Sequence, residues 1–230
     1  MSGALGSPRV HLRLTDSTND RARALAGAGA PHGTLVTATE QSAGRGRQGR
    51  RWSAPAGRAL LCSVVVREPP RLLPLAAGVA VATLVGENAR LKWPNDVLVD
   101  RRKVAGILLE GRPQEGWAVV GIGVNVALRE DDFPAELRGR AGTLALEPEA
   151  IEPALARLLE LLGYWIGADT SSVLDAVRAR DALLGAPVRW AGGRGRGAGI
   201  DGDGRLVVLT ATGRVALDAG EVHLAGAEQA

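Results

Sequence analysis

Cysteine is almost absent from this sequence of 230 residues, in which Cys62 stands alone. No disulfide can form within such a chain, which suits a reducing compartment, and we therefore expect the protein in the cytoplasm. Long apolar runs are also missing, because the most apolar stretch, residues 72–86, is shorter than the roughly 20 residues that span a bilayer. We expect no membrane association and, since the N-terminal segment contains charges and no apolar run, no signal peptide.

Histidines and aromatic residues are scarce as well. The 3 histidines lie far apart and provide no zinc-ligand spacing. Aromatic residues make up 3% of the chain, so stacking platforms for single-stranded nucleic acid are few. The net charge of +3 permits nucleic-acid binding without requiring it. Hydrophobic and charged fractions of 46% and 23% are those of a folded globular protein.

Lysine is nearly replaced by arginine. Lys92 and Lys103 are the only lysines in the sequence, and they lie close together. An ammonium group on a flexible stem differs chemically from a planar guanidinium, so the two lysines could mark positions where an ammonium is required. Chance explains such a pair equally well.

Apolar patterning predicts strands and helices that alternate up to about residue 185, followed by short β segments between glycine-rich turns. Ser17 and Asp20 resemble a capping box at the start of the first helix. The expected domains are residues 1–185 and, as a small β-barrel, residues 186–230. Strands are predicted at residues 12–14, 35–38, 59–66, 91–93, 97–99, 104–110 and 117–126, and helices at residues 17–26, 75–88, 151–165 and 172–184.

The densest chemical signal is the glycine- and arginine-rich segment of residues 40–52. Its letters G-x-G-x-x-G, at Gly44, Gly46 and Gly49, are not followed by a helix, so we reject a dinucleotide-binding turn. Arginines here suit carboxylates and phosphates, and glycines let the backbone approach a ligand. A solvated loop or a non-specific nucleic-acid patch fits the composition equally well. The glycine content and charge predict that residues 44–52 are disordered without a ligand.

Three later segments add weaker signals. Residues 92–96 join a lysine, a turn and an acid, which could bind phosphate and Mg²⁺, although Pro-Asn-Asp is also ordinary turn chemistry. Residues 103–110 form a strand opened by Lys103 with Gly106 inside it, and residues 121–125 alternate glycine with apolar residues. A glycine within a strand indicates close approach of another group, but plain sheet packing explains each segment when taken alone.

Taken together and in this order, these segments resemble the biotin–protein ligase family. The match comprises residues 17–19, 40–52, 92–96, 103–108 and 121–125, with residues 199–201 and 220–222 resembling its small C-terminal domain. The resemblance implies an α+β fold: a mixed β-sheet flanked by helices, as in biotin/lipoate ligases and class II synthetases, plus a C-terminal SH3-like β-barrel. It also implies that ATP and Mg²⁺ activate the substrate biotin as biotinyl-5′-adenylate, which then biotinylates a lysine of a biotin carboxyl carrier protein.

The resemblance also implies roles for individual residues. The expected catalytic residues are Lys103, Arg45 and Arg47, and Asp96 is the expected Mg²⁺ ligand. Biotin is expected to contact Ser17, Thr18, Asn19, Gln41, Gly44, Arg45, Gly46, Arg47, Lys103 and Gly106, and the nucleotide to contact Arg50, Trp52, Lys92, Asn95 and Asn125.

Little chain precedes Ser17, so we expect a monofunctional ligase without the DNA-binding helix-turn-helix domain of some relatives, and no specific DNA binding. A monomer and a homodimer both fit. Gln48 departs from the family, in which this position is often basic. Three alternatives stay open: a lipoate–protein ligase, a biotin binder without activity, and a nucleic-acid-binding module.

Overall fold

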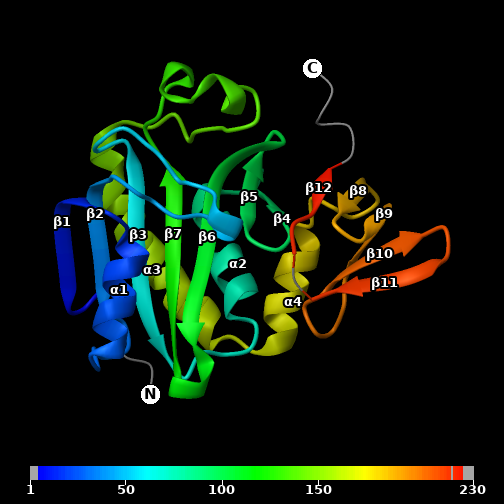
Figure 1. The fold of residues 1–230 in the computed structure, drawn as a ribbon, viewed down its shortest axis with the longest axis horizontal. Helices are drawn as coiled ribbons and strands as arrows, with labels where there is room; N and C mark the ends of the chain where they lie inside the picture. Colours follow the sequence, from blue (N-terminus) through cyan, green and yellow to red (C-terminus); the bar gives the residue numbers. More distant parts are fainter. Residues whose placement is uncertain (1–4, 219, 225–230) are drawn as a thin grey trace.

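A seven-stranded mixed sheet forms the centre of the computed structural model, which describes residues 5–218 and 220–224 (Figure 1). The strand order is β1-β2-β3-β7-β6-β5-β4. β1 and β2 are parallel, and the remaining neighbours are antiparallel, so the expected mixed sheet is confirmed. The strands are β1 (Arg9–Thr15), β2 (Leu35–Gln41), β3 (Ala59–Arg67), β4 (Arg90–Lys92), β5 (Asp96–Val99), β6 (Arg102–Arg112) and β7 (Trp117–Asn125).

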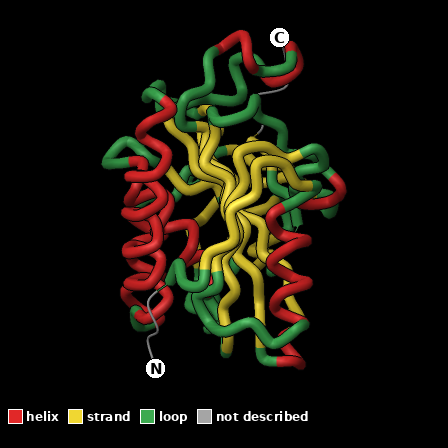
Figure 2. The backbone as a smooth tube through the Cα atoms, turned by 90° about the vertical axis from the view of Figure 1, so that its left-hand side faces the viewer, coloured by secondary structure: helices red, strands yellow, loops and turns green. Residues whose placement is uncertain are grey.

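Helices cover both faces of this sheet (Figure 2). Helix α1 (Thr18–Gly27) packs on one face against β2, β3 and β7. Helices α2 (Leu73–Val85) and α3 (Ile151–Gly167) pack together on the other face, where they share the main apolar core with β3, β6 and β7. Helix α4 (Thr170–Ala179) packs against α2. The expected fold of a mixed sheet flanked by helices is therefore confirmed.

Strand alternation in β7 separates the two faces. Val120, Ile122 and Val124 point into the core beneath α2 and α3, because side chains on a strand alternate between its faces. Gly121, Gly123 and Asn125 consequently lie on the α1 face. Gly121 and Gly123 leave the middle of that face without side chains, so other groups can lie directly against the backbone there.

Two local predictions were wrong. Ser17 occupies the N-cap position of α1 but makes no capping hydrogen bond through its side chain, so the capping box does not form. Helix α4 was predicted to continue to residue 184, but it ends at Ala179 because the chain beyond it pairs with β4. The Leu91 N–H donates to the Arg180 carbonyl (2.7 Å), and the Ala182 N–H donates to the Leu91 carbonyl (2.9 Å).

The C-terminal unit is a five-stranded antiparallel sheet in the order β11-β10-β9-β8-β12. Leu183, Val188, Leu206 and Val222 belong to the same apolar cluster as α2 and α4, so the two sheets share one core. The division at residue 185 stays a prediction, and residues 1–4, 219 and 225–230 of the two ranges lie outside the described residues. The strands are β8 (Pro187–Trp190), β9 (Gly193–Ile200), β10 (Leu206–Thr210), β11 (Gly213–Leu217) and β12 (His223–Leu224).

The remaining chain forms loops with short 3₁₀ turns. The glycine- and arginine-rich segment contains one such turn, at residues 47–49. Within the described residues, no helix is both long and apolar enough to cross a membrane. The turns are η1 (Arg47–Gly49), η2 (Pro113–Glu115), η3 (Glu130–Asp132), η4 (Ala135–Leu137) and η5 (Pro148–Ala150).

Candidate active site

A cavity of about 820 Å³ opens on the α1 face of the sheet. This volume lies within the range of about 300–1,000 Å³ that is typical of small-molecule sites. Strands β6 and β7 form its floor, and the start of α1, residues 45–53 and residues 221–224 contribute to its walls. Segments from the whole length of the chain therefore meet around one space.

Two glycines of β7 make this floor possible. A Cβ atom on Gly121 would lie 2.0 Å from Asn19 Oδ1, and one on Gly123 would lie 2.6 Å from Cε2 of Trp52. Both distances are too short for any side chain, so Asn19 and Trp52 rest on bare backbone. From the sequence alone, sheet packing and close approach of another group explained these glycines equally well, and the structure shows close approach.

One end of the cavity carries amides and hydroxyls, and we call Ser17, Thr18, Asn19 and Gln41 the polar end. Gln41 Oε1 accepts hydrogen bonds from the Thr18 backbone N–H (2.8 Å) and the Thr18 hydroxyl (3.1 Å). Ser63 donates to Thr18 Oγ1 (2.8 Å) and is 2.7 Å from Asn19 Oδ1. These hydrogen bonds fix the donors and acceptors in place before any ligand arrives.

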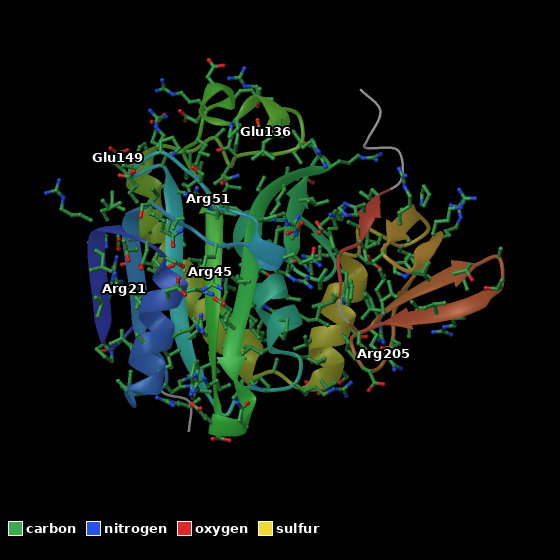
Figure 3. All side chains as sticks on the ribbon, viewed as in Figure 1. Arg21, Arg45, Arg51, Glu136, Glu149 and Arg205 are labelled. Carbon is green, nitrogen blue, oxygen red and sulfur yellow. The ribbon has the colours of Figure 1, made fainter. Side chains whose placement is uncertain are left out.

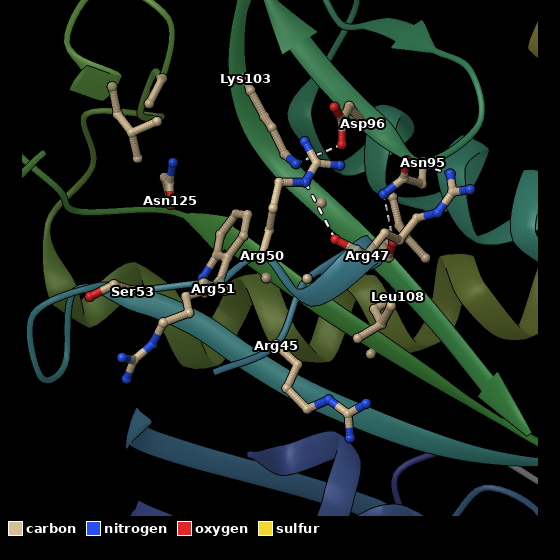
Figure 4. Close-up of a pocket in the computed structure, with 18 of the residues that line it drawn as sticks. Arg45, Arg47, Arg50, Arg51, Ser53, Asn95, Asp96, Lys103, Leu108 and Asn125 are labelled. Carbon is tan, nitrogen blue, oxygen red and sulfur yellow. Dashed lines mark hydrogen bonds and ion pairs between the residues drawn. The ribbon is translucent and has the colours of Figure 1, made fainter. Parts of the chain in front are cut away.

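The other end is cationic: Figure 4 shows Lys103, Arg47 and Arg50 around Asp96. Lys92 also lines this end of the cavity and contacts Asp96. Lys103 Nζ lies 2.6 Å from Asp96 Oδ1, and Lys92 Nζ lies 3.8 Å from Asp96 Oδ2. Burial lowers the pKa of Lys92, an effect that the Asp96 carboxylate opposes. The two lysines thus share one counter-ion, and an anionic ligand would find both beside it.

Residues 44–52 form an irregular hairpin beside the cavity, which we call the glycine-rich hairpin. The Gly46 N–H donates to the Arg50 carbonyl (2.7 Å), and the Trp52 N–H donates to the Gly44 carbonyl (2.9 Å). At its tip Arg47 donates to Asn95 Oδ1 (3.1 Å) and to the Gly220 carbonyl (3.1 Å). The hairpin therefore connects the cationic end to the C-terminal unit.

The Trp52 ring lies against Gly106 and Gly123 on the floor of the cavity. Its ring centroid is 5.6 Å from Lys103 Nζ, within the range of a cation–π contact. Its indole Nε1 is buried and has no hydrogen-bond partner among the described residues. A buried donor without a partner costs roughly 1–3 kcal/mol, so a ligand that accepts this hydrogen bond would relieve the cost.

Most residues predicted from the sequence line this cavity, and Gly44 is the exception. Gly44 is buried at the base of the hairpin, where a Cβ atom would come too close to the Trp52 carbonyl oxygen. Asn125 lines the cavity and donates to the Gly142 carbonyl (2.8 Å), so it also fixes the loop beyond β7. The lining includes Ser17, Thr18, Asn19, Gln41, Arg45, Gly46, Arg47, Arg50, Trp52, Lys92, Asn95, Asp96, Lys103, Gly106 and Asn125.

A further wall of the cavity was not predicted from the sequence. Phe133, Leu137 and Arg140 line the cavity from the loops after β7, and Arg101 lines it from the turn before β6. Glu221 reaches it from the C-terminal unit and pairs with Arg50 at 2.5 Å. The first four of these residues belong to no motif and are placed by chain packing, whereas Glu221 lies in the C-terminal segment 220–222, for which no role in the cavity was expected.

The acidic groups do not form a preformed metal site. Among the described residues, no group of three His, Cys, Asp or Glu side chains could hold a metal ion. Asp96 is a single buried carboxylate that already pairs with two lysines. This arrangement fits Mg²⁺ only if the ion arrives with a phosphate ligand, because Mg²⁺ can bind through one carboxylate, waters and substrate phosphates.

Comparisons with known proteins agree with this geometry. Residues 11–126 match the model of the biotin/lipoate A/B protein ligase family, and residues 191–224 match the biotin protein ligase C-terminal domain. The biotin–[acetyl-CoA-carboxylase] ligase of Paracoccus denitrificans is 37% identical, in an alignment covering 94% of this chain and 100% of the relative. The bifunctional ligase/repressor of Bacillus spizizenii is 37% identical over 61% of this chain, which spans about half (47%) of that relative.

The fold comparison points the same way. The structure of the biotin protein ligase from Aquifex aeolicus in complex with biotin and ATP superimposes with a TM-score of 0.79 at 29% identity, over 95% of this chain and 99% of that one. The expected SH3-like C-terminal unit is confirmed by the match of the C-terminal domain. Sequence and fold agree along nearly the whole chain, which therefore belongs to the biotin/lipoate A/B protein ligase family.

Proposed function

We propose that this protein is an ATP-dependent biotin–protein ligase. One observation carries the proposal: a single cavity joins an end built from amides and hydroxyls to an end built from cations. Biotin has a polar ureido ring at one end and a carboxylate at the other, so it matches both ends. The biotin and ATP named for the Aquifex relative, and the ligase activity named for the Paracoccus relative, support this assignment.

The first step joins two anions. The biotin carboxylate attacks the α-phosphorus of ATP, a P–O bond forms, and pyrophosphate leaves with the electrons of the broken bond. Lys103 would bridge the carboxylate and the α-phosphate, and Arg47 would offset the charge that develops there. Both cations already lie at one end of the cavity, so little rearrangement is required.

The second step transfers the acyl group. The amine of a carrier lysine attacks the acyl carbon of biotinyl-5′-adenylate, loses a proton, and AMP leaves. The glycine-rich hairpin would shield this mixed anhydride from water until the carrier arrives. No enzyme nucleophile is required, and burial raises the pKa of Cys62 to about 12, which keeps its thiol protonated.

The residue assignments within the cavity belong to the same proposal. Ser17, Thr18, Asn19 and Gln41 would bind the ureido ring, and Trp52 with Asn95 would contact the nucleotide. Asp96 would provide a carboxylate oxygen to a Mg²⁺ ion that enters with ATP and neutralises phosphate charge. Lys92 and Asn125 would help to arrange the phosphates.

The cellular setting is also a proposal. The lone, buried Cys62 suits the reducing cytoplasm. The partner would be the biotin carboxyl carrier protein of a carboxylase, and no specific DNA binding is expected. Residues 1–185 would form the catalytic domain and residues 186–230 the C-terminal domain, in a monomer or a homodimer.

The decisive experiment is acid-dependent exchange of labelled pyrophosphate into ATP, with biotin, with lipoate and without acid. Exchange with biotin alone supports the proposal. Exchange with lipoate alone would assign the protein to lipoate chemistry, which the family model also includes. No exchange with either acid would overturn the ligase assignment.

A further inference from the structure

Arg45 differs from the other arginines of the glycine-rich hairpin. Figure 4 shows its side chain directed away from Lys103 and Asp96, and Figure 3 places it beside α1. Its Nη1 lies 2.5 Å from Asp20 Oδ1, and its Nη2 lies 2.8 Å from Glu110 Oε1. Arg45 thus reaches two separate elements, α1 and β6.

These contacts belong to a charge-balanced quartet. Arg23 Nη1 lies 3.3 Å from Asp20 Oδ1 and 3.5 Å from Glu110 Oε1, so two guanidinium groups face two carboxylates. The charge of Arg45 is therefore already neutralised, whereas the cations near Asp96 outnumber their acids. A phosphate gains less from a cation whose charge is already paired, so Arg45 is poorly suited to the transition-state role that the resemblance implied.

Glu110 makes one further contact. Its second oxygen, Oε2, accepts a hydrogen bond from Asn19 Nδ2 at 2.9 Å. Asn19 is only 3% exposed, and Ser63 lies within hydrogen-bonding distance of its Oδ1. Without the Glu110 contact, the Asn19 amide would lose its shorter acceptor and keep only the Leu108 carbonyl at 3.3 Å. One carboxylate therefore orients the Asn19 amide and holds the base of the hairpin.

We propose that Glu110, assisted by Asp20, is a positioning residue that latches the glycine-rich hairpin closed through Arg45. The inference rests on the proposed function and assigns Arg45 to the latch instead of to the reacting phosphate. The base of the hairpin carries Arg45 between Gly44 and Gly46, so the latch also holds the pairing of Gly44 with Trp52. Closure of the hairpin and orientation of the polar end are thereby coupled through Glu110.

The test compares Glu110→Gln and Arg45→Gln with the wild type. Glu110→Gln keeps an oxygen that can accept from Asn19, so it removes mainly the ion pair. We expect the KM for biotin in pyrophosphate exchange to rise about five- to tenfold with kcat within about twofold, the size of one charge-assisted contact at a half-exposed site. With biotin and ATP present, when the hairpin is expected to be ordered, hydrogen exchange at the Gly46 and Trp52 amides is expected to accelerate on the same scale.

Double variants separate the latch from direct catalysis. If both residues act through each other, Arg45→Gln with Glu110→Gln is no worse than either single change, whereas Arg47→Gln with Glu110→Gln multiplies the two losses. Asp20→Asn is expected to change the same readouts in the same direction. Glu160→Gln, which removes an exposed Arg–Glu pair on α3, is the matched control and leaves them unchanged.

Two results would overturn the latch. One is hairpin exchange and biotin KM in Glu110→Gln within twofold of the wild type. The other is a loss of kcat by orders of magnitude in Arg45→Gln alone, which would assign Arg45 to the reacting groups. Amide exchange needs no turnover, so a wild type without biotin-dependent activity would defeat the proposed function while the exchange data still decide the latch.

Discussion

Replacing Lys103 with alanine tests the centre of the proposed mechanism. Lys103 Nζ is the closest cation to Asp96, at 2.6 Å, whereas Lys92 Nζ lies 3.8 Å from the same carboxylate. Removing a preorganised group that stabilises transition-state charge typically costs about 10²–10³ in rate, or roughly 2.7–4 kcal/mol. We expect adenylate formation, measured by biotin-dependent pyrophosphate exchange, to fall by that factor.

The fold should survive this substitution. The Lys103 side chain is 32% exposed, and Asp96 keeps Lys92 as a counter-ion, so we expect a loss of no more than about 2 kcal/mol and a drop in Tm of a few degrees. Lys103→Arg keeps the charge but replaces a compact ammonium with a planar fork, so an intermediate rate is expected. An unchanged exchange rate in Lys103→Ala would remove this lysine from the mechanism.

Three further predictions follow from other parts of the structure. Gly123→Ala places a methyl group 2.6 Å from the present position of Trp52 Cε2 and should displace the indole, raising the KM for ATP about tenfold, whereas an unchanged KM would contradict nucleotide contact by Trp52. The amides of residues 44–52 should exchange rapidly without ligand and slowly with biotin and ATP; equal protection in both states would refute the expected disorder. Burial raises the pKa of Cys62 to about 12, so the thiol ionises at lower pH in the unfolded chain than in the folded protein. The free energy of unfolding should therefore fall as pH rises from about 9 to about 12, by up to about 1.4 kcal/mol per pH unit. Chemical denaturation should show a smaller pH slope for Cys62→Ala, and equal slopes would contradict the raised pKa.

The sequence predicted those parts of the fold that depend on local patterning. Strand β7 and helix α3 were found because their apolar residues follow periods of about 2 and 3.6. The end of α4 was predicted too late in the chain because the backbone of Arg180 and Ala182 forms hydrogen bonds with Leu91, which is far away in the sequence, and does not continue the helix. The residues around the end of the helix do not indicate that a distant strand will form hydrogen bonds with it.

The residues of the candidate site also fall into a group that the sequence predicted and a group that it could not predict. Segments such as residues 92–96 could be found because several chemical groups stand together in the sequence. Phe133 and Arg140 could not, since isolated apolar and basic residues in a loop look alike whether or not they face a cavity. The role of Glu110 was hidden for another reason: its partners Asn19 and Arg45 are about 90 and 65 residues away, and only the sheet brings them together.

The apolar core shared by the two sheets affects how this protein can be divided. Leu183 and Val188 stand on either side of the proposed domain boundary and are both fully buried in one cluster. Trp93, in the turn before β5, donates a hydrogen bond to the Gly204 carbonyl at 3.1 Å. A fragment ending at residue 185 would present an uncovered apolar surface to water, which favours aggregation. The two sheets should consequently unfold in a single cooperative thermal transition. During evolution, the C-terminal sheet could be replaced only together with the apolar surface of the larger unit on which it packs.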